Sequence, residues 1–339
     1  MSRKLITLSL TATLMGGTAF AEAPSVAVDI APVHSLVARV MDGVSTPDLI
    51  IQPGASPHEY SLRPSEAAAL QNADLVFWIG PGLTPWMSDT IETLAADAAV
   101  TELLEADGTI ELAFRESALF EAHDHDDHEE HGHDDHGHDD HADEAAAENA
   151  HADHDDHGDE KAGHEGHDHG AHDPHAWLSP RNAMTWLNVI AGQLSAADPD
   201  NAGAYFANAA AGRAEIEALM AEVSATLDPV RGGQFIVFHD AYQYFEMDFD
   251  FFASGAISIG DASDPSPGRV AEIQGRIAEQ GINCVLAEPQ FNPGLVETVM
   301  SGTDAQTGIL DPLGSDLEPG PALYRQLIKN LSAALAGCM

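Results

Sequence analysis

The histidines of this chain form two groups that could bind metal in different ways. Fifteen of the 19 histidines lie between residues 123 and 172, among 13 Asp, 6 Glu and a single lysine. Histidines interspersed closely with carboxylates are typical of metal-binding segments. We call residues 123–172 the tract. We expect auxiliary, weak metal binding at its histidines: His123, His125, His128, His131, His133, His136, His138, His141, His151, His154, His157, His164, His167, His169 and His172.

The composition of the tract predicts that it does not fold. It contains no Leu, Ile, Val, Met, Phe, Tyr or Trp, so nothing offsets the entropy cost of ordering its backbone. We therefore expect a disordered loop over about residues 116–172. A plain spacer or a cloning tag is the alternative, although a tag is usually a pure histidine run at a terminus. A disordered segment cannot present one fixed ligand geometry, so a specific site is expected elsewhere.

Two of the remaining four histidines follow predicted strands. His58 lies in the loop after the apolar run 48–51, and His239 comes directly after the run 235–238. Ligands of open α/β sheets gather beyond the carboxyl ends of the strands. These two side chains are therefore expected at a binding site.

Proline stiffens two further candidate ligand loops. His175 follows Asp173-Pro174, and Asp311 precedes Pro312 at the end of a predicted strand. Together with His58 and His239 they predict a metal site with three imidazoles and either Asp311 or water as the fourth ligand. This set suits Zn²⁺, whereas Mn²⁺ would draw more oxygen ligands and Ni²⁺ or Cu²⁺ would also accept imidazole. The fourth histidine, His34, is expected to be structural or to support a ligand.

Strands and helices alternate on both sides of one long helical pattern, which indicates an α/β fold with parallel sheets. We expect an N-terminal lobe over 22–198, a connecting helix over 199–228 and a C-terminal lobe over 229–339. Strands are predicted at 26–30, 48–51, 75–80, 235–238, 256–259, 282–287 and 307–310. Helices are predicted at 33–41, from 64 onward, and at 181–194, 199–227, 269–280, 295–300 and 323–336.

The N-terminus has the pattern of a secretory signal peptide. A basic start and a short apolar run lead to Ala19-Phe20-Ala21, which predicts cleavage of residues 1–21 and export to a Gram-negative periplasm. No later segment is long and apolar enough to span a bilayer. The formal net charge is −43, and 19 acidic residues against one lysine give the tract −18 of it. Such acidity disfavours nucleic-acid and membrane-surface roles and makes cations the expected partners.

Cys284 and Cys338 are the only cysteines. In an oxidising compartment they predict a disulfide, which would stabilise by about 4 kcal/mol in the chain-entropy model. Free thiols that bind zinc are the alternative, but the pair lacks Cys-x-x-Cys spacing.

The chain resembles the periplasmic zinc-binding proteins of bacterial zinc ABC importers, the ZnuA type within the cluster A-I solute-binding proteins. The resemblance covers essentially the whole mature chain, including the tract and both cysteines. It rests on four segments: PGASPHEYSLRP at 53–64, DPHAWLSP at 173–180, VFHDAY at 237–242 and LDPLG at 310–314.

This resemblance implies two α/β lobes joined by one rigid long helix, with metal in the cleft between them and delivery to an inner-membrane ABC permease. His58, His175 and His239 match the three histidine ligands of the family, and Asp311 matches a carboxylate used by related members. Some relatives have a Glu just before the first ligand histidine, where this chain has Pro57. Glu59, on the other side of His58, is expected to be solvated.

Zinc capture and delivery by a monomeric, non-catalytic protein is therefore the expected function, with Zn²⁺ as the transported ligand. The tract is expected to be an auxiliary segment for low-affinity zinc capture or for sensing zinc abundance. A periplasmic zinc buffer without a transporter and a zinc hydrolase that uses Asp311 or Glu59 as a base are the alternatives. No Gly-x-Ser-x-Gly, phosphate-binding loop or His-Glu-x-x-His motif is present.

Overall fold

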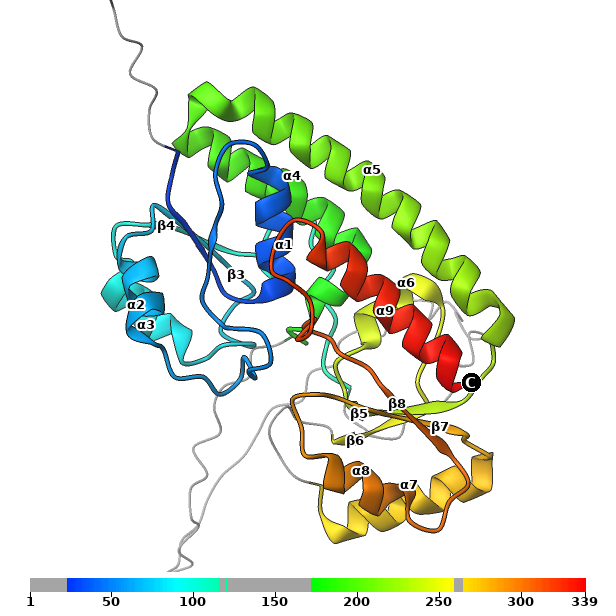
Figure 1. The fold of residues 1–339 in the computed structure, drawn as a ribbon. Coiled ribbons are helices and arrows are strands. Elements are labelled where there is room, and N and C mark those ends of the chain that lie inside the picture. Colours follow the sequence, from blue (N-terminus) through cyan, green and yellow to red (C-terminus); the bar gives the residue numbers. More distant parts are fainter. Residues whose placement is uncertain (1–22, 116–119, 121–171, 259–264) are drawn as a thin grey trace, which may run out of the picture.

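A computed structural model describes residues 23–115, 120, 172–258 and 265–339. The predicted signal peptide and every tract histidine except His172 lie outside these residues. Figure 1 shows two α/β lobes with helices packed along one side of both.

The first lobe contains a parallel sheet in the order β2-β1-β3-β4. Its strands are β1 (Val26–Val28), β2 (Asp48–Leu49), β3 (Leu75–Trp78) and β4 (Ala99–Glu102). All residues of β1 and β3 are buried, as expected for central strands that helices cover on both faces. α1 (Ala31–Val40), α2 (Pro64–Gln71) and α3 (Met87–Leu94) connect these strands.

The second lobe repeats this topology with a parallel sheet in the order β6-β5-β7-β8. Its strands are β5 (Phe235–His239), β6 (Gly255–Ser258), β7 (Cys284–Ala287) and β8 (Gln306–Ile309). The shorter helices of this part of the chain are α6 (Gln243–Phe249), α7 (Pro267–Gln280) and α8 (Pro293–Met300).

Three long helices brace the two lobes. α4 (Pro180–Ala197) leads into α5 (Ala202–Leu227), which has 26 residues and is therefore about 39 Å long at 1.5 Å per residue. α5 packs against α1, α4 and the terminal helix α9 (Leu323–Cys338), and α9 in turn contacts α1 and β8. Figure 1 shows α5 running past both lobes, so the predicted long joining helix is confirmed.

The predicted disulfide is also present, between Cys284 in β7 and Cys338 at the end of α9, with 5.6 Å between the two Cα atoms. Neither thiol is therefore free to bind zinc. The cross-link fixes the C-terminus of α9 to the second sheet.

Several predicted boundaries differ from the structure. The strand predicted at 282–287 begins only at Cys284, and the helix predicted at 181–194 extends over Pro180–Ala197. The helices α3 and α6 and the strand β4 are not predicted from the sequence. Within the described ranges, no helix has both the length and the apolar character that a bilayer span requires.

Candidate metal centre

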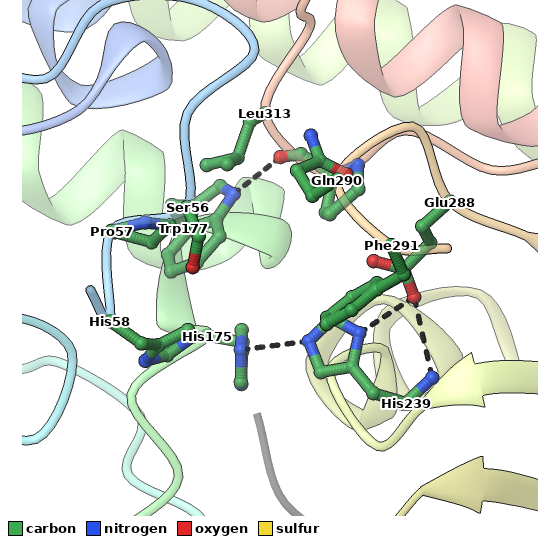
Figure 2. Close-up of a pocket in the computed structure, with 11 residues that line it drawn as sticks. Ser56, Pro57, His58, His175, Trp177, His239, Glu288, Gln290, Phe291 and Leu313 are labelled. Carbon is green, nitrogen blue, oxygen red and sulfur yellow. Dashed lines mark hydrogen bonds and ion pairs between the residues drawn. The ribbon is translucent and has the colours of Figure 1, made fainter. Parts of the chain in front are cut away.

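Three histidines from separate segments of the chain converge at the boundary between the lobes. Nitrogen atoms of His58, His175 and His239 all lie within 4.8 Å of one another, and Figure 2 shows the His175 ring between those of His58 and His239. Nε2 of His175 is 3.3 Å from Nε2 of His239. The His175 ring centroid is 5.8 Å from that of His58 and 5.1 Å from that of His239. Such spacing allows one small cation to contact all three rings.

The fold explains why residues so distant in sequence meet here. His58 lies in the loop after β2, and His239 is the last residue of β5. Both therefore project from the carboxyl edges of parallel sheets, as the sequence predicted. His175 precedes the short 3₁₀ helix Ala176–Leu178 that leads into α4. One ligand thus comes from each sheet and the third from the segment entering the long helices.

Two buried carboxylates orient two of these rings. Nδ1 of His175 is 2.6 Å from Oδ1 of Asp173, and Nδ1 of His239 is 2.6 Å from Oε1 of Glu288. An imidazole that donates from Nδ1 to a carboxylate presents the Nε2 lone pair to a metal and becomes a stronger ligand. The two carboxylates thus preorganise the rings of His175 and His239, whose Nε2 atoms lie 3.3 Å apart.

The sequence patterns predict no role for these two carboxylates, and Asp173 is there only part of a stiff proline loop. Glu288 directly follows β7 (Cys284–Ala287), so the strand-end rule that selected His239 would also have selected it. Glu288 is almost fully buried, which requires a hydrogen-bonding partner such as the imidazole.

The pocket around the histidines has a largely apolar wall contributed by both lobes. The Trp177 ring centroid is 5.2 Å from that of His175, and its indole N–H donates to the carbonyl oxygen of Pro312. An apolar wall limits water access and strengthens metal–ligand interactions. The residues that line the pocket are Ser56, Pro57, His58, His175, Trp177, His239, Glu288, Gln290, Phe291, Pro312 and Leu313.

Asp311 is not part of the converging group. Its Oδ1 accepts hydrogen bonds from the backbone N–H groups of Leu313 and Gly314, and its Oδ2 accepts one from that of Ser315. The amide of Gln290 also donates to Oδ1. The Asp311 carboxylate therefore stabilises the conformation of its own loop. This loop includes the Pro312 carbonyl oxygen, which accepts the hydrogen bond from the Trp177 indole.

The surroundings of His34 and Glu59 agree with the structural and solvated positions expected for them. Nε2 of buried His34 is 3.1 Å from the carbonyl oxygen of Pro47, and burial lowers the pKa of this imidazole. A neutral ring in the core of the first lobe fits a structural role. Glu59 is exposed in the loop next to His58.

An ion-pair network supports the segment that carries His239. The guanidinium of Arg115 contacts the carboxylates of Asp240 and Glu246, both of which are buried. Burial raises the pKa of each carboxyl, and Arg115 opposes that shift. Arg115 belongs to the first lobe, so this network joins the two lobes next to the pocket.

Two α/β lobes braced by a long helix, with three converging imidazoles between them, define a metal-binding protein of the two-lobed solute-binding class. Comparison with known proteins identifies the family. The family model described as zinc-uptake complex component A, periplasmic (ZnuA), matches residues 26–338. The chain therefore belongs to this family.

Individual relatives agree with this assignment. The high-affinity zinc uptake system protein ZnuA of Brucella abortus (strain 2308) is 47% identical over 96% of this chain and 94% of that protein. The protein of the same name from Paracoccus denitrificans is 42% identical over 94% of this chain and 93% of its own length. A crystal structure of a ZnuA superposes with a TM-score of 0.67 at 22% identity, over 93% of this chain and 99% of that one.

Family membership confirms two expectations from the sequence. The resemblance to zinc-importer binding proteins is correct. Proteins of this family are transport components, so the chain is a periplasmic binding component of an importer and not a hydrolase.

Proposed function

We propose that this protein captures one Zn²⁺ ion at His58, His175 and His239 and delivers it to an ABC permease in the inner membrane. The observation that carries the proposal is the convergence of the three rings, two of which have Nδ1 held by a buried carboxylate. Oriented, neutral imidazoles are the ligand form that zinc prefers. The names of the relatives from Brucella and Paracoccus support zinc as the ion.

We infer that water completes the coordination of the ion. The Asp311 carboxylate already accepts three backbone hydrogen bonds, and breaking them to reach the metal would leave those N–H groups unsatisfied at a cost of about 1–3 kcal/mol each. The pocket lining includes the amide side chain of Gln290, which could hydrogen-bond such a water. A site that is easily opened at one position suits a carrier that must release its ion.

For the tract we propose a separate role in weak capture of several zinc ions. Its composition supports this role, and His172 joins it directly to the segment that carries His175. Imidazoles with a pKa near 6.5 release metal as they protonate, so this capture should fade below about pH 6. In this proposal the tract raises the local zinc concentration, and the three-histidine pocket selects the ion.

Growth under zinc limitation tests delivery to a permease. A strain that lacks this gene is complemented with the wild-type gene or with His58/His175/His239→Ala, and the controls are excess zinc in the medium and equal periplasmic protein levels. We expect only the wild type to restore growth at low zinc, and both strains to grow equally with zinc added. Normal growth of the deletion strain at low zinc would instead make the protein a buffer without a transporter.

A further inference from the structure

A second group of potential metal ligands lies outside the three-histidine pocket. Within residues 23–115, 120, 172–258 and 265–339, only two groups of side chains bring three or more ligand atoms within 4.8 Å of one another. The first is the pocket, and the second is formed by Glu105, Glu111 and His172. Nδ1 of His172 is 3.2 Å from Oε2 of Glu111, and the two side chains are 35% and 34% exposed. This group is thus open to solvent, unlike buried His175 and His239.

Backbone pairing holds two members of the group together. His172 pairs with Ala113 in an antiparallel bridge, and the N–H of Asp173 donates to the carbonyl oxygen of Leu112 at 2.8 Å. Glu111 is two residues before Ala113, so it is the diagonal neighbour of His172 on the same face, within reach of a long side chain. The contact therefore follows from the chain path and not only from attraction between side chains.

The third member stands at the carboxyl edge of the first sheet. A hydrogen bond from the Leu104 N–H to the Ile79 carbonyl continues the strand pairing past β4, and Glu105 follows at once. Burial and the negative charge of Glu105 raise the pKa of nearby Glu102. Negative charge is thus concentrated at this edge, where a bound cation would offset it.

The position of the group relates it to the pocket. His172 is the last residue of the tract and precedes Asp173, which orients His175. Because His172 and His175 are three positions apart in the sequence, their Cα atoms are at most about 11 Å apart. In the sequence, His172 thus stands between the other tract histidines and His175.

We propose that Glu105, Glu111 and His172 form a second, weaker site for a divalent cation. One imidazole and two carboxylates, completed by water, are an acceptable ligand set for Zn²⁺ and less selective than three imidazoles. Its solvent exposure implies fast exchange. If the proposed function holds, this site receives zinc from the tract and holds it a short distance along the chain from His175.

Anomalous diffraction from crystals of the full-length protein, recorded at the zinc absorption edge with zinc in excess, tests the proposal. The variant is Glu105→Gln/Glu111→Gln. The control Glu279→Gln/Glu297→Gln removes two exposed carboxylates from helices of the other lobe, which changes the net charge equally. We expect two peaks in the wild type and the control, and only the three-histidine peak in Glu105→Gln/Glu111→Gln. Equilibrium dialysis should show a loss of about one bound equivalent in that variant alone.

Several results would overturn the proposal. One is the absence of a second peak when the three-histidine site is full, and another is its persistence in Glu105→Gln/Glu111→Gln. Loss of the second peak in the charge-matched control would indicate general electrostatic attraction. Loss of both peaks in Glu105→Gln/Glu111→Gln would assign these carboxylates a structural role. A missing three-histidine peak in the wild type would instead contradict the proposed function, so the two failures are distinguishable.

Discussion

The carboxylate of Glu288 provides a direct way to measure how orientation of the ligands contributes to zinc affinity. Its Oε1 is 2.6 Å from Nδ1 of His239 and also accepts the backbone N–H of the same residue at 3.4 Å. Glu288→Gln keeps the shape and one acceptor oxygen but removes the negative charge. The ring then keeps its place while Nε2 becomes a weaker ligand.

Loss of such a supporting carboxylate costs about 10- to 100-fold in metal affinity, which corresponds to about 1.4–2.7 kcal/mol. We expect Glu288→Gln to weaken zinc binding by this factor in competition titrations against a chelator of known affinity. Asp173→Asn should act similarly, because the contact of Asp173 with His175 has the same length of 2.6 Å.

Glu297→Gln on α8 is the matched control, because it makes the same chemical change at an exposed position. Its zinc affinity should equal that of the wild type. Circular dichroism should show that all variants are folded. An unchanged dissociation constant in Glu288→Gln, or an equal loss in the control, would refute the view that this carboxylate strengthens the ligand.

Three further predictions concern residues near the pocket or in the first lobe. Asp311→Asn should lower the free energy of unfolding by about 1–3 kcal/mol, because hydrogen bonds to the backbone are lost. Its zinc affinity in titration should be unchanged. A loss of zinc affinity as large as that from removing a ligand histidine would make Asp311 a ligand. Arg115→Met should lower the free energy of unfolding, measured with urea, by about 3–5 kcal/mol, because buried Asp240 and Glu246 lose their cation. This loss of stability should shrink as acid protonates the two carboxyls. A loss of stability independent of pH would contradict this reasoning. Burial raises the pKa of the Asp29 carboxyl from 3.8 to about 7. As pH falls, the folded state therefore binds this proton before the unfolded state does. The resulting stabilisation is fully present below the unfolded pKa and is lost as pH rises through the folded pKa. Asp29→Asn should remove this pH dependence of the free energy of unfolding, which amounts to at most about 4 kcal/mol. If the free energy of unfolding varied with pH equally in the variant and the wild type, this prediction would be wrong.

Strongly patterned elements could be predicted from the sequence. Buried strands such as Leu75–Trp78 and Phe235–His239 are continuous apolar runs, and the long helix Ala202–Leu227 stands between two β/α sets. By contrast, β4 has the sequence Ala-Val-Thr-Glu and is partly exposed at a sheet edge. It has no continuous apolar run, so the pattern gave no signal for it.

The same distinction applies to the metal centre. Each of the three histidines has a local signal, either a strand end or a stiff proline loop, and the structure brings them together. The hydrogen bonds of Asp311 to its own loop depend on a backbone turn that residue types alone do not define. The pairing of His239 with Glu288 joins residues 49 positions apart, which requires knowledge that β5 and β7 are neighbours.

We propose that one tight zinc site is formed by His58, His175 and His239 and not by the tract. Competition titration of the wild type, of a variant without residues 123–172 and of His58/His175/His239→Ala tests it directly. We predict one tight equivalent in the wild type and in the tract deletion, and none in the triple variant. Retention of the tight equivalent in the triple variant, or its loss with the tract, would contradict this account.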